Sequence, residues 1–175
     1  YGQEFNPFTF GIAKADMLIR GGDPENMQFG NTLNDDKFAN YTFDYCISNP
    51  PFGIDWKREA AGVEAEHKLG DKGRFGVGLP PKSDGQMLFM LNGLAKLKDT
   101  GRMAIIQNGS PLFTGDAGSG PSEIRRYIIE NDWLDAIVQL PNDSFYNTGI
   151  ATYIWIITKD KPEARREQVL LIDAS

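Results

Sequence analysis

Two consecutive prolines, Pro50 and Pro51, impose the tightest constraint on how this chain folds. They follow the apolar run 43–48, which is typical of a buried β-strand, and they stand between Asn49 and Phe52. Proline cannot donate a hydrogen bond to a sheet, and it restricts the residue before it to extended backbone. The strand is therefore predicted to end at Asn49, with an amide, carbonyl groups and an aromatic ring held in one rigid turn.

This turn has two interpretations. In an open α/β sheet ligands bind at the carboxyl ends of the strands. An amide oxygen beside an aromatic ring suits a planar base that carries an exocyclic amine. The alternative is an ordinary turn with Phe52 in the core, and the four residues alone leave both interpretations open.

Composition narrows the class of protein. Hydrophobic residues make up 41% of the 175 residues, enough for one globular core, and no apolar stretch approaches the roughly 20 residues that cross a bilayer. The single cysteine, Cys46, excludes an internal disulfide and favours a reducing, cytoplasmic setting. His67, the only histidine, has no ligand or catalytic partner, so we interpret it as a surface residue and expect no metal site.

Strand and helix patterns alternate in the first part of the chain. A strand ends at Glu4, and a helix capped by Asn6 begins at Pro7. Its buried face is predicted from the helical spacing of Phe8, Ile12, Ala15 and Ile19. A short strand at 27–30, a polar loop at 31–36 and the strand 43–48 follow, and this alternation favours an α/β fold with parallel strands.

Periodicity fails between residues 53 and 82, where we expect a long loop. Its glycine-rich run 73–78 lacks the strand and the Lys-Ser/Thr pair of a phosphate loop, so we reject that interpretation. Basic residues in the loop could contact phosphate, but acidic residues interleave with them, and a solvated loop is the alternative. The basic residues are Lys57, Arg58, Lys68, Lys72, Arg74 and Lys82.

The second half resumes the α/β pattern. A capping box from Ser83 to Gln86 opens a helix whose buried face runs from Met87 to Leu97 and which ends at Gly101. A strand at 102–107, a glycine-rich segment at 108–120 and a helix from Pro121 come next. Strands at 134–140 and 151–158, joined by 141–150, are predicted to form a hairpin, with an edge strand at 169–172.

Several of these segments, taken in order, resemble the modification (methyltransferase) subunit of type I restriction–modification systems. Asn-Pro-Pro-Phe alone occurs in several amino-methylating families, but the ordered set is specific and covers essentially the whole chain. The matching segments are 1–4, 29–33, 49–53 followed by Asp55 and Trp56, 101–105, and Phe145 followed by 148–152.

The resemblance implies a Rossmann-like methyltransferase fold that depends on S-adenosylmethionine, with a doubly wound, mostly parallel sheet and a C-terminal antiparallel hairpin. By the same resemblance, residues 1–175 form a partial catalytic domain, incomplete at its N-terminus. The first strand, the glycine-rich motif and the N-terminal helical region are missing, so we expect the isolated chain to be inactive.

The implied reaction is methylation of adenine N6 in DNA, in a complex with a specificity subunit and a restriction subunit. A net charge of −6 agrees with this division of labour, since proteins that hold DNA alone carry a basic face. Catalysis would come from Asn49, Pro50, Pro51 and Phe52. The Asn49 side-chain oxygen and the Pro50 carbonyl would accept both N–H bonds of the amine, while Phe52 stacks on a flipped base.

The resemblance also suggests contacts with the cofactor and a second contact with the base. Glu4 would take the ribose hydroxyls, although a solvated carboxylate at a helix start is the alternative. Asn31, where related enzymes often carry Asp, would lie near the cofactor's adenine, with Thr32 and Leu33 lining that pocket and Asn49 close to it. Phe145 would be the second face for the flipped base, and a core phenylalanine is the alternative.

Two rival functions remain open. Another amino methyltransferase, acting on guanine in ribosomal RNA, on cytosine N4 or on a protein glutamine, could use the same turn. A non-catalytic fragment that retains the fold is the other rival.

Overall fold

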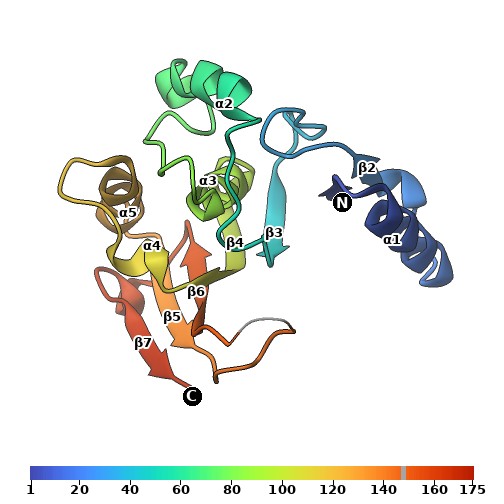
Figure 1. Cartoon of the computed structure of the whole chain (residues 1–175). Helices are drawn as coiled ribbons and strands as arrows, with labels where there is room; N and C mark the ends of the chain where they lie inside the picture. The colour runs from blue at the N-terminus through green and yellow to red at the C-terminus, as the bar shows by residue number, and fades with distance from the viewer. Residues whose placement is uncertain (147–148) are drawn as a thin grey trace. The chain divides into compact units, whose positions relative to one another are not determined.

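The computed structural model describes residues 1–146 and 149–175, in two compact units of residues 1–41 and 42–175 (Figure 1). The first unit contains β1 (Gly2–Glu4), α1 (Pro7–Ile19), the 3₁₀-helix η1 (Pro24–Asn26) and β2 (Met27–Phe29). The strands β1 and β2 are parallel, and Glu4 pairs with Phe29 at their carboxyl ends. The predicted order strand, helix, strand is therefore confirmed.

The start of α1 follows from its cap, as predicted. The Asn6 side-chain oxygen accepts hydrogen bonds from the backbone N–H groups of Phe8 (2.9 Å) and Thr9 (3.2 Å), which would otherwise lack partners in the first turn. Pro7 takes the first helical position, where its missing N–H costs nothing.

The predicted buried face of α1 was wrong for this unit. Phe8 and Ile19 are 78% and 84% exposed. The half-buried positions follow a different helical stripe, because the ring of Phe10 packs on Phe29 of β2 at 5.5 Å between ring centres. These positions are Phe10, Ala13, Lys14 and Met17.

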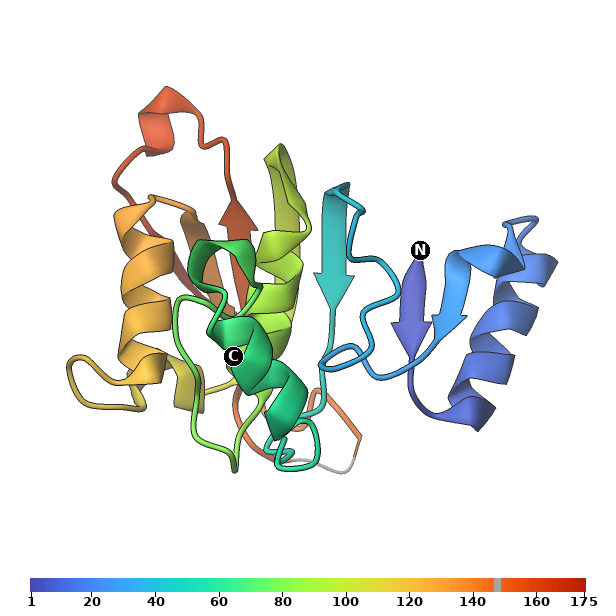
Figure 2. The same cartoon turned by 90° about the horizontal axis from the view of Figure 1, so that it is seen from above.

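The second unit is a five-stranded sheet in the order β3-β4-β6-β5-β7 (Figures 1 and 2). Its strands are β3 (Phe43–Ser48), β4 (Leu97–Asn108), β5 (Leu134–Gln139), β6 (Thr152–Thr158) and β7 (Leu170–Asp173). The strand β3 is parallel to β4, and β7 is parallel to β5. Because β6 runs antiparallel to both β4 and β5, the predicted C-terminal hairpin and edge strand are confirmed.

Two helices, α3 (Gln86–Ala95) and α5 (Gly120–Glu130), lie over the same face of this sheet (Figures 1 and 2). Burial alternates along β4, where Met103 and Ile105 are buried and Arg102 is exposed, as the two-residue period of a strand requires. From α5, Ile124 and Ile128 are buried, whereas Tyr127 lies at the edge of the core against the ring of Trp133.

The boundary between α3 and β4 differs from the prediction. Leu97 and Gly101 belong to β4, not to the helix, because the chain turns at Lys96 and pairs with β3 from Leu97 onward. The predicted capping box was also wrong. The helix begins at Gln86, and Asp84, not Ser83, accepts the Gln86 backbone N–H (3.2 Å).

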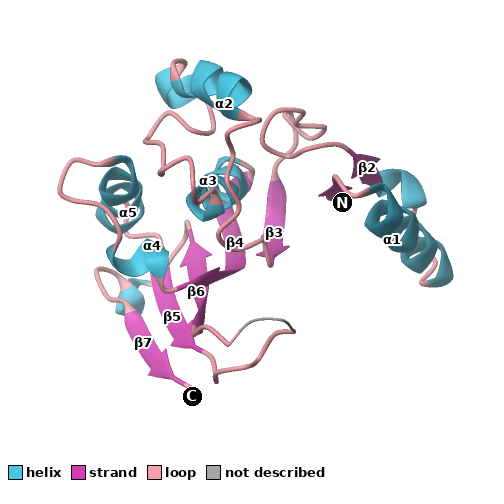
Figure 3. Cartoon of the chain, in the orientation of Figure 1, coloured by secondary structure: helices cyan, strands magenta, loops and turns pink. Residues whose placement is uncertain are grey.

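The long connection between β3 and α3 is not irregular throughout (Figure 3). It contains α2 (Ala60–His67) and the 3₁₀-helix η2 (Gly70–Lys72). Val63 is the one buried residue of α2, so its sequence carries no helical stripe to detect. Two further short helices lie elsewhere in the unit, α4 (Ser110–Phe113) within the glycine-rich segment and η3 (Glu163–Arg165) before β7.

Among the described residues of this connection, ion pairs occupy three of the basic ones, the first being Lys57, which lies 4.0 Å from Asp55. Arg74 Nε and Nη2 donate to the Glu66 carboxylate, both at 2.7 Å, and Lys82 lies 2.7 Å from Glu64. These contacts favour the interpretation of a mixed, self-paired loop over a phosphate-binding one. His67 is half-buried, not a surface residue, because its Nδ1 hydrogen-bonds the Phe75 carbonyl at 2.7 Å.

Candidate active site

The turn after β3 leaves the sheet at the edge where β4 also ends. Ser48 pairs with Ile105 in the parallel register, so Asn49 and the prolines lie beyond the carboxyl end of β3, beside the last residues of β4, which ends at Asn108. Pro50 is buried and Asn49 is exposed. Gly53 has a φ of +62°, a left-handed conformation that favours glycine and that turns the chain sharply after Phe52.

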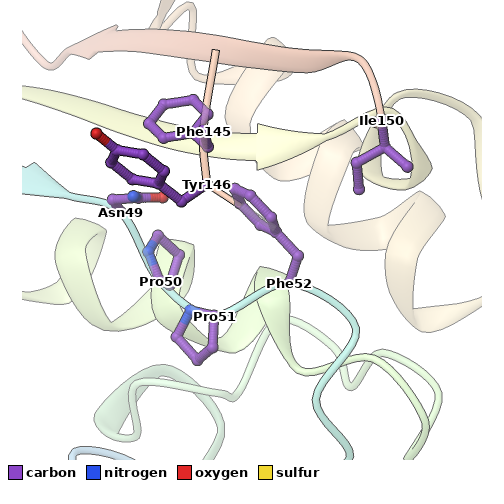
Figure 4. Close-up of a pocket in the computed structure, with 7 residues that line it drawn as sticks. All are labelled: Asn49, Pro50, Pro51, Phe52, Phe145, Tyr146 and Ile150. Atoms are coloured by element: carbon purple, nitrogen blue, oxygen red, sulfur yellow. The ribbon is translucent and has the colours of Figure 1, made fainter. Parts of the chain in front are cut away.

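A cavity of about 420 Å³ opens at this turn. One wall is the turn itself, and the other comes from the connection between β5 and β6 (Figure 4). The close-up shows three aromatic rings gathered beside Asn49 and the two prolines. The described lining residues are Asn49, Pro50, Pro51, Phe52, Phe145, Tyr146 and Ile150.

The structure thus brings together every residue predicted to contact the base. Phe145 comes from a segment distant in sequence from Asn49 and Phe52, and its half-buried ring faces the same cavity. No described residue hydrogen-bonds the Asn49 side chain, so its amide oxygen can accept a bond from a ligand. Of the described lining residues, none is Asp, Glu, His, Lys or Cys.

Sequence reasoning missed two lining residues, Tyr146 and Ile150. Tyr146 is 99% exposed at the rim. The sequence offered a weak signal, since Ile150 lies within the segment 148–152 that carries the resemblance and Tyr146 lies between Phe145 and that segment. Thr148, part of that segment, lies outside the described residues.

Hydrogen bonds fix the segment that follows the turn. The Trp56 backbone N–H donates to the Lys82 carbonyl (3.0 Å), and the indole N–H of Trp56 donates to the Pro81 carbonyl (3.0 Å). Trp56 is only 2% exposed, so this ring anchors the segment in the core. The chain after Phe52 is therefore held against the segment that precedes α3.

Of the residues predicted to contact the cofactor, all except Asn49 lie in the unit of residues 1–41. Glu4 is the last residue of β1 and Asn31 closely follows β2, so both lie at the carboxyl ends of neighbouring parallel strands. One Glu4 carboxylate oxygen accepts the Asn6 N–H (2.6 Å), and the other has no partner among the described residues. The Asn31 side-chain oxygen accepts the Leu33 N–H (3.1 Å), and Leu33 itself is 5% exposed.

Within the described residues, no group of three or more His, Cys, Asp or Glu could hold a metal ion. The same residues include no helix with the length and apolar character needed to span a membrane.

The sheet order, the rigid polar turn and the aromatic cavity define a class, the Rossmann-like methyltransferases that use S-adenosylmethionine. The structure of a class I methyltransferase from Listeria monocytogenes shares this fold over 99% of the chain, with a TM-score of 0.70 and 17% identity. The model of the N-6 DNA Methylase family matches residues 1–175, and the chain belongs to that family.

Methylase subunits of type I restriction enzymes are similar to this chain. The chain is 31% identical over 174 residues to the MjaIX methylase subunit of a type I restriction enzyme from Methanocaldococcus jannaschii, covering 99% of this chain and 30% of that protein. It is also 31% identical to the HindI methylase subunit from Haemophilus influenzae, covering 99% and 37%. The chain therefore spans about a third of the length of these relatives.

A solved structure gives the same result. The methyltransferase subunit of a type I restriction–modification system from Streptococcus thermophilus superposes with a TM-score of 0.82 at 30% identity. This match covers 99% of the chain and 35% of that subunit.

Proposed function

We propose that this chain is the catalytic part of a methylase subunit of a type I restriction–modification system, which transfers a methyl group to N6 of adenine in DNA. The observation that carries the proposal is the shared cavity, in which Asn49 and the prolines meet the rings of Phe52 and Phe145 (Figure 4).

The cavity suits a single flipped base. Its volume of about 420 Å³ lies within the range of small-molecule sites. Enzymes that modify a base must extrude it from the duplex, since the target atom is inaccessible in the stack. Phe52 and Phe145 provide apolar faces for the base, and such stacking is worth about 1–3 kcal/mol per base.

The polar turn supplies what the amine needs. Adenine N6 is a poor nucleophile because its lone pair is delocalised into the ring. Asn49 Oδ1 and the Pro50 carbonyl can accept its two N–H bonds, which favours tetrahedral nitrogen and turns the lone pair away from the turn. No strong base is required, in keeping with a cavity whose described lining holds no carboxylate, histidine or amine. Catalysis on this account is positioning and electrostatic stabilisation.

The cofactor's nucleoside half fits the first unit. The Glu4 carboxylate, with one oxygen unpaired among the described residues, is suited to the ribose hydroxyls. The loop after β2 offers Asn31 and Thr32 to the adenine ring, with buried Leu33 supporting the loop from inside. S-adenosylmethionine, when bound, supplies an activated methyl group on its sulfonium. Asn49 is also proposed to lie close to it.

The net charge of the chain and its similarity to type I methylase subunits suggest its partners. A chain with a net charge of −6 is poorly suited to hold DNA phosphates alone. We therefore assign most of the DNA grip to a specificity subunit, with a restriction subunit added for cleavage, and place the assembly in the cytoplasm.

The identity of the methylated product tests the proposal. The full-length protein, assembled with its specificity subunit, is incubated with labelled S-adenosylmethionine and either duplex DNA or ribosomal RNA, and the nucleosides are analysed by mass spectrometry. We expect N6-methyladenine from DNA. Methylcytosine, methylguanine from RNA, or label on protein would support the rival amino methyltransferases, and no transfer would support a non-catalytic role.

A further inference from the structure

A buried glutamine outside the cavity connects the segments around it. Gln86, the first residue of α3, is 0% exposed. Its side-chain nitrogen donates to both carboxylate oxygens of Asp84 (2.9 Å each) and to the Asn108 side-chain oxygen (3.0 Å). Its side-chain oxygen accepts the Asn108 backbone N–H (3.0 Å). One amide thus uses its donors and its acceptor in a fixed network.

On one side, this network fixes the exit from β4. Asn108 is the last residue of that strand, and its side-chain oxygen also accepts the backbone N–H of Ser110, where α4 begins. Gln86 therefore determines how the chain leaves the sheet beside the candidate site.

On the other side, the network reaches the turn that contains Phe52. Gly85, next to Gln86, donates its N–H to the carbonyl of Ile54 at 3.0 Å, and Ile54 lies two residues after Phe52. A movement of the Gln86 side chain would therefore be transmitted to the backbone that follows Phe52.

We propose that Gln86 is a positioning residue for methyl transfer, which holds the segments leaving β3 and β4 in a fixed relation. The parallel pairing of Ser48 with Ile105 brings those exits to one edge, and Gln86 joins them. The inference rests on the proposed function. Gln86 does not line the cavity itself. Its effect on the turn that carries the Asn49 side-chain oxygen passes through Gly85 and Ile54.

The chemistry of the network allows a test by pH. Among the described residues, the one charged group in contact with Gln86 is the Asp84 carboxylate, and β4 contributes the uncharged Asn108 and Gln107. A carboxyl group introduced by Gln86→Glu would be buried beside Asp84, and both conditions raise the pKa of that group. Once protonated, it can again donate one hydrogen bond. Its repulsion of Asp84 also disappears.

The experiment compares Gln86→Met and Gln86→Glu in the full-length assembled protein, with kcat expressed per folded molecule. Gln86→Met should lower kcat by about tenfold to a hundredfold, the cost of a small misplacement, with the KM for S-adenosylmethionine changed less than about threefold. Gln86→Glu should be equally impaired at alkaline pH. Its kcat should then recover as the pH falls, by up to about tenfold per pH unit.

Two controls separate positioning from stability and from a general effect of charge. Gln168→Glu makes the same chemical change at an exposed residue, and its pH profile should match the wild type. Ile124→Val loses stability within the buried face of α5, and its kcat per folded molecule should be unchanged. A wild-type pH profile for Gln86→Glu, or a kcat for Gln86→Met as high as that of Ile124→Val, would overturn the proposal.

Hydrogen exchange gives a readout that is independent of the substrate. Loss of the Gln86 acceptor should speed exchange at the Asn108 amide, and the disturbance should extend to the Gly85 amide. If exchange is faster in the variant but the wild type forms no N6-methyladenine, the proposed function is refuted and the network stands. Unchanged exchange at both amides would refute the network.

Discussion

The rings of Phe52 and Phe145 line a single cavity, although Phe52 follows β3 and Phe145 lies in the connection between β5 and β6. The two segments approach because β4 pairs with β3 on one side and with β6 on the other. The sheet order thus creates the site, by bringing a rigid polar turn and a distant aromatic segment to one edge.

Replacing Phe52 separates a stacking role from a core role. Phe52→Ala should lower methyl transfer by about 1–3 kcal/mol of transition-state stabilisation, roughly 5- to 150-fold, whereas Phe52→Trp keeps a π face and should retain most activity. If Phe52 were a core residue, Trp would be the worse replacement through overpacking. Turnover and melting temperature measured on both variants distinguish the two roles.

Tyr146 should contribute to DNA binding at the rim of the cavity. Its ring is 99% exposed, so Tyr146→Ala should change the free energy of unfolding by no more than about 0.5 kcal/mol. We expect it to raise the KM for duplex DNA several-fold, because an exposed aromatic ring beside a flipped base can stack on nucleotides. Tyr146→Phe, the matched control, keeps the ring and should behave as the wild type. Unaltered DNA kinetics in Tyr146→Ala would remove this residue from the site.

The sequence predicted the parts of the site that are local. Two prolines end β3 wherever it lies, so the position and stiffness of the turn follow from residues 49–52 themselves. The meeting of this turn with Phe145 depends on strand order, which periodicity does not encode, and it entered only through the resemblance. Tyr146 follows no periodic pattern, so only its position next to Phe145 pointed to it, and the structure was needed to place it at the rim of the cavity.

The wrong predictions have physical causes. The stripe of Phe8 and Ile19 in α1 is real, but a helix in this unit buries the face that meets β2. Gly101 was taken as a helix stop, whereas it sits within β4, where the register with β3 shifts between Phe43 and Tyr45. Glycine occurs both at helix ends and at strand irregularities, so the presence of a glycine alone did not distinguish the two.

The ion pair between Asp132 and Lys161 should stabilise the second unit in a pH-dependent way. Lys161 Nζ lies 2.5 Å from Asp132, and the Lys161 side chain is buried. This hydrogen bond, and a second from the Glu167 backbone N–H, lower the pKa of the Asp132 carboxyl. The stabilisation is therefore complete above the unfolded pKa of about 4, and it is lost as the pH falls through the lower folded value.

Asp132→Asn is the matching variant, because Asn tolerates the left-handed φ of +55° found at this residue. It should cost on the order of 2 kcal/mol at neutral pH, less than for a fully buried pair, since Asp132 is partly exposed. Melting temperatures of the variant and the wild type should converge only as the pH falls below the lowered folded pKa of Asp132. The exposed control Asp116→Asn should change little. A constant difference at all pH values would contradict an ionic origin.

The isolated chain of residues 1–175 should bind S-adenosylmethionine weakly and should not methylate DNA. The resemblance assigns the methionine half of the cofactor to a glycine-rich turn outside these residues. Losing several hydrogen bonds worth about 0.5–1.5 kcal/mol each multiplies into orders of magnitude in affinity. Among the described residues, β1 pairs only with β2 and β3 only with β4, and such free edges favour self-association. Calorimetric titration and light scattering test both parts; micromolar binding by a monomer would contradict them.

Asn49→Ala tests the central claim most directly, with methyl transfer and cofactor binding measured on one preparation of the full-length assembly. Asn49 Oδ1 is proposed to orient the target amine, whereas the cofactor's main anchors lie elsewhere. Removing an acceptor that acts in the transition state costs about 10²–10³ in rate by analogy with oxyanion-hole donors. The account predicts a loss of N6-methyladenine formation of at least that size, with the Kd for S-adenosylmethionine within about threefold of the wild type. Near-normal methyl transfer by Asn49→Ala would contradict it.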